Sequence, residues 1–309
     1  MNYNMPESHT GIFTNNLTFS YGKTTVLHGI NLMVPEGKVY GFLGPNGAGK
    51  TTLIRLLAGL LPAYQGHINI FGHLLYDHRV EILRNIGLLI ERPSLYPRLT
   101  GYENLKLQQL YTGATKQDIQ EALDIVDLQV SAKNRVSTYS MGMKQRLGIA
   151  MAILRRPRLL ILDEPVNGLD PNGVKSIRNL ISILNKQMAM TIFLSSHLLS
   201  EVEKVADHVG VIQNGHLIFQ GSIQELNVLA QKILEIKTSD TTSALVTIEE
   251  MGYECNQSTT DTLKVVYESL ADIARINEKL VSRHISVYQL LPTHISLEEN
   301  YAKLLDNAS

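Results

Sequence analysis

Residues 44–51 have the types and the spacing of a loop that binds phosphate. They run Gly44-Pro45-Asn46-Gly47-Ala48-Gly49-Lys50-Thr51, between an apolar run at 39–43 and a leucine-rich stretch at 53–57. Glycines leave backbone N–H groups free to point at an anion, and a helix that starts behind the loop adds its positive end. In this pattern the lysine reaches the β- and γ-phosphates of a nucleoside triphosphate, and the threonine holds Mg²⁺. We expect nucleotide contacts from Asn46, Gly47, Gly49, Lys50, Thr51 and Thr52.

Polar side chains of catalytic type follow two short apolar runs further along the chain. Asp163 and Glu164 come directly after residues 159–162, and His197 follows residues 192–194 within three positions. Wholly apolar runs of this length predict strands that are buried on both faces of a parallel sheet. Because ligands of such sheets bind beyond the carboxyl ends of the strands, we expect these three side chains to lie near the phosphate loop.

The residue types at these strand ends predict separate roles in hydrolysis. Mg²⁺ prefers oxygen ligands, so Asp163 is expected to hold the metal together with Thr51. Glu164 is the candidate general base for the attacking water. His197 is expected to hydrogen-bond the γ-phosphate, although a histidine at a strand end is also common as a cap or a packed ring.

A third motif, at residues 139–146, precedes a helix with an apolar face. It runs Tyr139-Ser140-Met141-Gly142-Met143-Lys144-Gln145-Arg146. Ser140 offers a hydroxyl and Gly142 an unobstructed N–H, and the helix behind them directs its positive end at any anion bound there. The motif predicts a second phosphate-binding cap. The alternative is an ordinary core helix that Ser140 caps.

The elements that carry these motifs predict an α/β domain of the P-loop NTPase class over residues 1–225. Its expected parts are an antiparallel β subdomain with strands at 17–21 and 30–34, the phosphate loop, a helical subdomain at about 92–157, and a hairpin at 209–220. The helical part begins with Thr100 and Glu103 at the spacing of a capping box. The hairpin contains Asn214-Gly215, a pair typical of two-residue turns.

The last part of the chain, residues 226–309, predicts a separate small α+β domain. Its pattern of strand, helix, two strands, helix and strand is the βαββαβ order of a ferredoxin-like unit. The expected elements are 233–238, 241–251, 253–257, 263–267, 270–283 and 285–290. A loose tail is the alternative. We find no catalytic constellation in this segment.

Composition limits the class of protein. The 309 residues carry a formal charge of −1, so no overall basic field favours nucleic acid or an anionic membrane surface. The single cysteine, Cys255, excludes an internal disulfide framework and a multi-cysteine zinc site. The N-terminus lacks the pattern of a secretory signal. No apolar run approaches the roughly 18 residues of a membrane helix, so work at a membrane requires another chain.

The order of the motifs resembles the nucleotide-binding subunit of ABC transporters over residues 13 to about 225. Tyr21 matches the aromatic residue that stacks on adenine in that family, and Ser140 and Gly142 match its signature motif. Asp170 matches a family aspartate that communicates between subunits. The resemblance implies ATP and Mg²⁺ as ligands, ATP hydrolysis, and a head-to-tail dimer. A homodimer is expected, and a pair of different halves stays open. It also implies an integral-membrane permease on a separate chain, and hence a place at the cytoplasmic face of the membrane.

The sequence departs from the family pattern in two places, and the second departure indicates a branch of the family. Met141 and Met143 stand where the signature has glycine and glutamine. Glu91 stands where most members have a glutamine near Mg²⁺ and water, which resembles the bacitracin-export and lantibiotic-immunity branch. A carboxylate binds Mg²⁺ more strongly but repels phosphate, so Glu91 is a candidate metal ligand and catalytic residue, with an incidental surface glutamate as the alternative. The resemblance also implies that residues 91–97 face the membrane partner and that residues 296–301 form a closing helix.

These observations lead to three hypotheses for the function. The leading one is an ATP-hydrolysing motor subunit of an exporter for a peptide antibiotic or a related amphipathic compound. The second is a soluble ABC ATPase that acts on nucleic acid or ribosomes. A single phosphate loop, the lack of a heptad-bearing insert and the lack of a Lys/Arg patch argue against it. The third is a regulatory subunit whose nucleotide binding matters more than turnover. An intact catalytic set argues against it, namely Lys50, Asp163, Glu164 and His197. The cargo is not specified by this chain, because the membrane partner contacts it.

Overall fold

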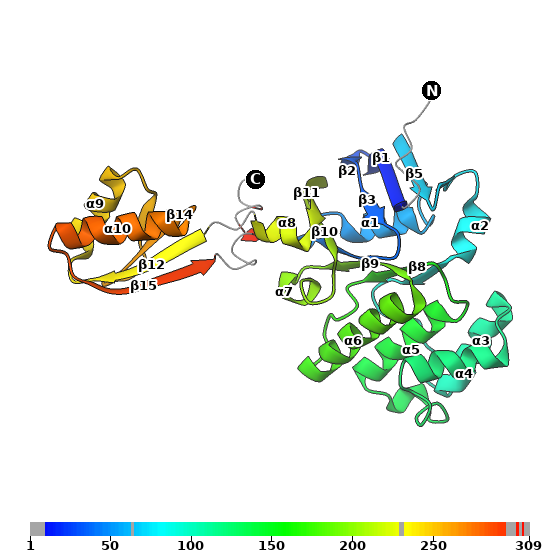
Figure 1. Cartoon of the computed structure of the whole chain (residues 1–309). Helices are drawn as coiled ribbons and strands as arrows, with labels where there is room; N and C mark the ends of the chain where they lie inside the picture. Colours follow the sequence, from blue (N-terminus) through cyan, green and yellow to red (C-terminus); the bar gives the residue numbers. More distant parts are fainter. Residues whose placement is uncertain (1–9, 63–64, 229–231, 295–300, 303–304, 306–309) are drawn as a thin grey trace. The chain divides into compact units, whose positions relative to one another are not determined.

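The computed structural model describes residues 10–62, 65–228, 232–294, 301–302 and 305 (Figure 1). The chain divides into two compact units, Met1–Ile223 and Gln224–Ser309. Apart from Tyr301, the closing helix expected at 296–301 lies outside the described residues. Within the described part of the chain, no helix combines the length and the apolar character that crossing a bilayer requires.

The first unit contains an antiparallel sheet built on the long strand β1 (Thr10–Tyr21). Its other strands are β2 (Thr24–Ile30), β3 (Met33–Pro35), β5 (Gln65–Ile70) and β6 (His73–Leu74). β1 pairs antiparallel with β2, β3 and β5, so the predicted antiparallel subdomain is confirmed. β1 is longer than the expected segment, because buried side chains from Ile12 to Phe19 reach the core along most of its length.

A second sheet of this unit has the strand order β11-β10-β4-β9-β8-β7. The strands are β4 (Val39–Leu43), β7 (Ile86–Leu89), β8 (Leu159–Asp163), β9 (Thr191–Ser196), β10 (His208–Gln213) and β11 (His216–Ser222). All pairs are parallel except β10 with β11. β4, β8 and β9 are buried at every residue, which explains their apolar sequences. Asn214 and Gly215 both have positive φ, 47° and 76°, so the predicted hairpin turn is confirmed.

Helices connect these strands, and three of them form the helical insertion between β7 and β8 (Figure 1). The helices of the first unit are α1 (Lys50–Leu57), α2 (Arg79–Arg84), α3 (Gly101–Thr112), α4 (Lys116–Ile125), α5 (Met141–Ile153), α6 (Pro171–Met188) and α7 (Leu199–Val202), and α8 (Ile223–Val228) begins at the last residue of this unit. Thr100 and Glu103 form the predicted capping box at the start of α3. α5 packs against β7, α4 and α6, so the insertion is tied to the parallel sheet.

Aromatic side chains hold the strands that lead to the site. Phe193 of β9 stacks on Tyr40 of β4 with ring centroids 5.7 Å apart, and its centroid lies 5.5 Å from that of Phe42. All three rings are fully buried, and burial raises the pKa of Tyr40. Truncation of a core phenylalanine of this kind to alanine lowers the free energy of unfolding by about 3–5 kcal/mol. Packing of these rings therefore holds the ends of β4 and β9 in a fixed position relative to each other.

The second unit forms a four-stranded antiparallel sheet with two helices. Its elements are β12 (Lys232–Thr238), α9 (Thr241–Glu250), β13 (Cys255–Gln257), β14 (Thr262–Tyr267), α10 (Leu270–Ser282) and β15 (Val287–His294). The strand order β13-β14-β12-β15 is that of a ferredoxin-like unit, so the predicted βαββαβ order is confirmed. Ile276 and Leu280 of α10 are fully buried against the sheet, as the apolar stripe of that helix requires.

Candidate functional site

The phosphate loop leaves the carboxyl end of β4 and runs directly into α1, as predicted. Gly49 has φ 109°, a region that side chains with a Cβ rarely adopt. Gly44 is required for a different reason, because a Cβ at this position would lie 2.5 Å from the carbonyl oxygen of Ile212. Asn46 and Gly47 form the exposed tip of the loop, and Thr52 is half-buried in the first turn of α1. The loop therefore offers an open cradle of backbone in front of a helix N-terminus, which suits a bound phosphate.

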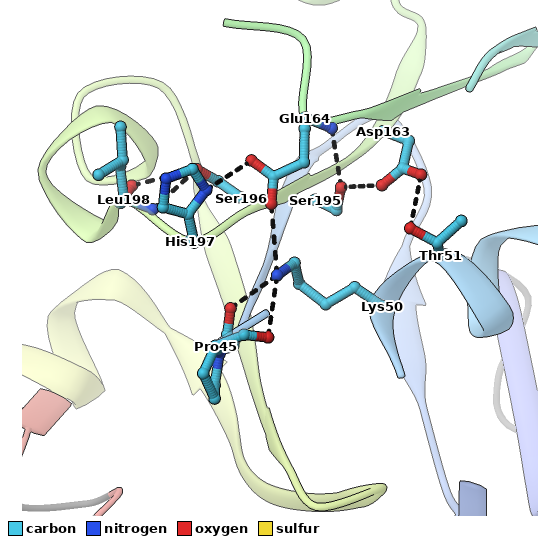
Figure 2. A network of polar contacts seen from close by, with 10 residues as sticks. Pro45, Lys50, Thr51, Asp163, Glu164, Ser195, Ser196, His197 and Leu198 are labelled. Atoms are coloured by element: carbon cyan, nitrogen blue, oxygen red, sulfur yellow. Dashed lines mark hydrogen bonds and ion pairs between the residues drawn. The ribbon is translucent and has the colours of Figure 1, made fainter. Parts of the chain in front are cut away.

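The ammonium group of Lys50 is directed inward, and the side chain is 6% exposed (Figure 2). Its Nζ donates hydrogen bonds to the carbonyl oxygens of Gly44 at 2.7 Å and Pro45 at 3.2 Å. The same Nζ lies 3.3 Å from Oε1 of Glu164. A buried charge needs such partners, and here the loop itself and one carboxylate supply them.

Thr51 and Asp163 meet at the start of α1 although 112 positions separate them. The hydroxyl of Thr51 donates to Oδ2 of Asp163 at 2.8 Å, and Asp163 is fully buried. Two hard oxygen atoms thus lie side by side next to the loop. This is the donor chemistry that Mg²⁺ prefers, so the residues present fit this ion.

Glu164 connects the phosphate loop to the end of β9. Oε1 pairs with Lys50, and Oε2 lies 2.9 Å from Nδ1 of His197. Its backbone has φ 49°, an uncommon conformation for a residue other than glycine, and residues held in such conformations cluster at functional sites. The structure therefore brings together Lys50, Thr51, Asp163, Glu164 and His197, which the parallel topology predicts (Figure 2).

Ser195 is a member of this network to which the sequence analysis assigns no role. Its hydroxyl donates to Oδ1 of Asp163 at 2.5 Å and accepts the backbone N–H of Glu164 at 2.9 Å. In the sequence Ser195 is visible only as a polar residue at the end of an apolar run. The contact follows from the register of β8 and β9, in which Asp163 lies beside Ser195.

Tyr21 and Glu91 lie outside the hydrogen-bond network of Figure 2. Tyr21 ends β1 with 46% of its surface exposed, and its ring packs edge-on against Phe19 with centroids 4.9 Å apart. Glu91 is 66% exposed and forms an ion pair at 3.7 Å with Arg55, which lies one turn after Thr51 on α1. The structure thus places Glu91 near α1, with its carboxylate on Arg55 rather than on Thr51 or Asp163.

Ser140, Gly142 and Asp170 form a second group at the starts of α5 and α6. Ser140 caps α5 by accepting the N–H of Met143 at 3.2 Å, and Asp170 caps α6 by accepting the N–H of Gly173 at 3.2 Å. A Cβ on Gly142 would lie 3.8 Å from Cα of Gly173, so the two helix starts are close. Among the described residues, no hydrogen bond joins this group to the phosphate loop. Ser140 is exposed, so capping does not prevent it from meeting a ligand.

A groove of about 660 Å³ lies between β7 and the helical insertion. Its lining includes the largely apolar side chains of Leu89, Pro93, Tyr96, Leu107, Tyr111 and Met151 together with polar ones such as Asn104 and Gln108. Three arginines also line it, Arg84, Arg92 and Arg155, and none of them forms an ion pair with a described residue. No acidic side chain is among the lining residues. The groove therefore combines apolar side chains with positive charge.

Sequence and structure comparisons with known proteins agree with one another. Residues 27–167 match the family described as ABC transporter. The chain is 44% identical over 301 residues to the bacitracin transport ATP-binding protein BcrA of Bacillus licheniformis, covering 96% of this chain and 97% of that protein. It is 46% identical over 205 residues to the lantibiotic transport ATP-binding protein SrtF of Streptococcus pyogenes, covering 66% of this chain and 88% of that protein. The solved structure of cbiO1 from Clostridium perfringens, part of the ABC transporter complex cbiONQ, has a TM-score of 0.66 at 27% identity and covers 71% of this chain and 90% of its own.

Proposed function

This chain belongs to the ATP-binding subunits of ABC transporters, and we propose that it powers the export of a peptide antibiotic or a related amphipathic compound of the bacitracin or lantibiotic type. One observation supports this class of transported compound. The match to a bacitracin transport protein spans almost the whole chain and therefore includes the second unit. A match to the nucleotide-binding unit alone would be common to many transporters. The alternative of a soluble ABC ATPase that acts on nucleic acid or ribosomes is not favoured by these relatives.

ATP binding in this proposal exchanges the partners of Lys50. The phosphate oxygens of ATP replace Glu164 and the loop carbonyls as acceptors for Nζ, and the glycine N–H groups hold the same phosphates. Release from Lys50 frees one oxygen of Glu164 to take a proton from water. That water attacks the γ-phosphorus, and the bond to the β-phosphate oxygen breaks to give ADP and inorganic phosphate. His197 is proposed to keep Glu164 oriented through Nδ1 and to present its other ring nitrogen to the γ-phosphate.

Mg²⁺ is proposed to be held by Thr51 and Asp163 together with phosphate oxygens and water. The closeness of the two protein oxygens and the burial of Asp163 support this assignment. When bound, Mg²⁺ neutralises charge on the phosphates. Glu91 is proposed as a further contributor near the metal, through a movement away from Arg55.

A second subunit is proposed to complete each nucleotide site. Ser140 and Gly142 stand at the positive end of α5, and Asp170 stands at the start of α6 beside them. Because these residues do not join the phosphate loop within one chain, they are proposed to face the nucleotide of the partner in a head-to-tail dimer. Tyr21 is proposed to stack on adenine, which its half-exposed ring permits.

The membrane permease is proposed to dock in the groove beside β7, which places the chain at the cytoplasmic face of the membrane. The groove includes Arg92, Pro93, Ser94 and Tyr96, from the segment that the family resemblance assigns to the partner. A lining that combines apolar side chains with three arginines that form no ion pair with a described residue fits an amphipathic helix that carries acidic residues. The proposed partner is therefore a short acidic and apolar cytoplasmic segment of the permease.

The test is to co-express the tagged chain with a candidate permease from the same cell and purify both from membranes. We expect a stoichiometric complex whose ATP hydrolysis is stimulated by bacitracin or a lantibiotic, and cells that lose resistance when Lys50 is replaced by alanine. Arg92→Glu with Arg155→Glu should release the permease, whereas Arg98→Glu, an exposed arginine outside the groove, should not. Recovery of the chain only with ribosomes or nucleic acid would contradict the proposal.

A further inference from the structure

Ser195 lies between the two acidic residues on which the chemistry depends. It is fully buried at the end of β9, beside Asp163 of β8 in the parallel register. Its hydroxyl uses both of its capacities, donating to Oδ1 of Asp163 at 2.5 Å and accepting from the backbone N–H of Glu164 at 2.9 Å (Figure 2). Ser195 therefore holds the carboxylate of Asp163 directly and holds Glu164 through its backbone N–H.

The hydrogen bond to Asp163 decides which of its oxygens faces the phosphate loop. Oδ1 is occupied by Ser195, and Oδ2 is turned toward the hydroxyl of Thr51. A carboxylate without the first bond is free to rotate and would leave a buried oxygen without a donor. Hydrogen bonds of this kind, one step away from a metal, orient the ligand and tune its affinity.

The hydrogen bond to Glu164 holds an unfavourable backbone conformation. Glu164 has φ 49°, and such conformations persist only where the surroundings fix them. Ser195 supplies part of that constraint by accepting the N–H of this residue. The direction of the Glu164 side chain toward Lys50 and His197 depends on this backbone.

We propose that Ser195 is a positioning residue that aims Oδ2 of Asp163 at the metal and holds Glu164 in register with the attacking water. It acts through these two residues and touches neither substrate nor metal. The inference rests on the proposed function, because it needs ATP with Mg²⁺ at this site. It goes further by assigning a role to a residue that none of the motifs includes.

The neighbouring serine provides a matched control. Ser196 is also buried, but its hydroxyl accepts the N–H of Leu198 at 3.0 Å, within its own turn. Replacing Ser196 with alanine removes a buried hydroxyl next to the site without touching Asp163 or Glu164. A general effect of lost packing or polarity on this strand end should therefore appear in Ser196→Ala as well.

The experiment compares Ser195→Thr with Ser195→Val in the full chain. The two side chains have nearly the same shape and differ in the hydroxyl, so steric effects of the added methyl group are common to both variants. Binding of Mn²⁺, as a spectroscopic substitute for Mg²⁺, is titrated by electron paramagnetic resonance in the presence of ADP. ATP binding in EDTA is measured alongside, and so is the Mg²⁺ concentration for half-maximal hydrolysis.

We expect Ser195→Val to weaken Mn²⁺ binding about 10- to 100-fold, the range found for residues that orient a metal ligand. Ser195→Thr should stay within about threefold of the wild type, and ATP binding in EDTA should change little in either variant. Equal Mn²⁺ affinity in the Thr and Val variants would overturn the proposal, as would an equal loss in Ser196→Ala. If Val lowers the thermal midpoint below the assay temperature, Ser195→Cys, whose sulfur is a weaker donor, replaces it under the same criteria. A wild-type chain that neither binds ATP nor hydrolyses it in the presence of Mg²⁺ would instead contradict the proposed function.

Discussion

Lys50 and Glu164 form an ion pair at 3.3 Å that is almost completely buried, with the two side chains 6% and 16% exposed. The pair joins the start of α1 to the end of β8, two elements that belong to distant parts of the sequence. Breaking a buried pair by removing one partner is costly, because the remaining charge is left uncompensated. Phosphate is a good substitute partner for Lys50, so we expect the phosphates of a bound nucleotide to replace Glu164 in this ion pair.

Glu164→Gln tests this exchange. We expect hydrolysis to fall by about 10²- to 10⁴-fold, since the general base is lost, while ATP stays bound. Without ATP, the variant should be less stable by about 1–3 kcal/mol, because Lys50 loses its buried counter-charge, and saturating ATP should restore most of that loss. Phosphate release, retained nucleotide after gel filtration, and thermal unfolding with and without ATP measure these effects.

The control is Glu203→Gln, which neutralises an exposed carboxylate shortly after His197. It should leave hydrolysis and the effect of ATP on stability unchanged. A Glu164→Gln variant that hydrolyses ATP at the wild-type rate would remove Glu164 from the role of base.

Glu91→Gln tests the departure from the usual family glutamine. We expect hydrolysis to continue, with a changed Mg²⁺ dependence or a changed number of ATP molecules used per transported molecule. Stability should change by less than about 1 kcal/mol, because the ion pair with Arg55 is exposed. The measurements are Mg²⁺ titration of hydrolysis and transport in proteoliposomes with the permease.

Arg55→Gln separates two explanations for any effect of Glu91. It breaks the same ion pair while keeping the carboxylate. If both variants shift the Mg²⁺ dependence equally, the ion pair is responsible rather than a contact between Glu91 and the metal. Wild-type behaviour of Glu91→Gln in both hydrolysis and transport would end the case for a special role.

Much of the fold is predictable because its signals are local in sequence. The phosphate loop needs particular residue types at fixed spacing, and β8 and β9 need apolar runs because they are buried on both faces. The turn at Asn214-Gly215 needs two residues that tolerate positive φ. In each case the physical requirement acts on neighbouring residues, so it leaves a pattern.

The details of the site are less predictable because they depend on the register between distant segments. Ser195 contacts Asp163 only because the two residues are neighbours across β8 and β9. The contact of Lys50 with Glu164 and that of Glu91 with Arg55 depend likewise on how α1 sits against the sheet. A serine at a strand end or an exposed glutamate has no sequence pattern that states its partner.

Asp272→Asn tests the acid stability of the second unit. Hydrogen bonds from the backbone and hydroxyl of Ser269, and from the hydroxyl of Tyr253, lower the pKa of Asp272 from 3.8 to about 2. Because the pKa is lower in the folded state, the stabilisation is present above about pH 4 and is lost as the pH falls toward 2. We expect α10 of the wild type to lose protection over this range, and Asp272→Asn to be less protected at pH 5 with a flatter pH profile.

Hydrogen exchange of peptides that cover α10, corrected for the intrinsic rate at each pH, measures this protection. Glu278→Gln, an exposed carboxylate on the same helix, serves as the control and should keep the wild-type profile. An unchanged profile in Asp272→Asn would show that the hydrogen bonds accepted by Asp272 do not contribute to acid stability.

Cys255 provides a reporter for opening of the second unit. Burial, with a smaller effect from Glu249, raises the pKa of its thiol to about 11. The thiolate is the reactive form, so the raised pKa should slow labelling by a thiol reagent at pH 8 about 100-fold through ionisation alone, and steric protection slows it further. Leu280→Ala removes a fully buried side chain of the same core, so it should lower the free energy of unfolding by about 2–5 kcal/mol and accelerate labelling. Leu270→Ala, at an exposed site, serves as the control and should have neither effect. Equal labelling rates in native and denatured wild-type chain would contradict the buried position of Cys255.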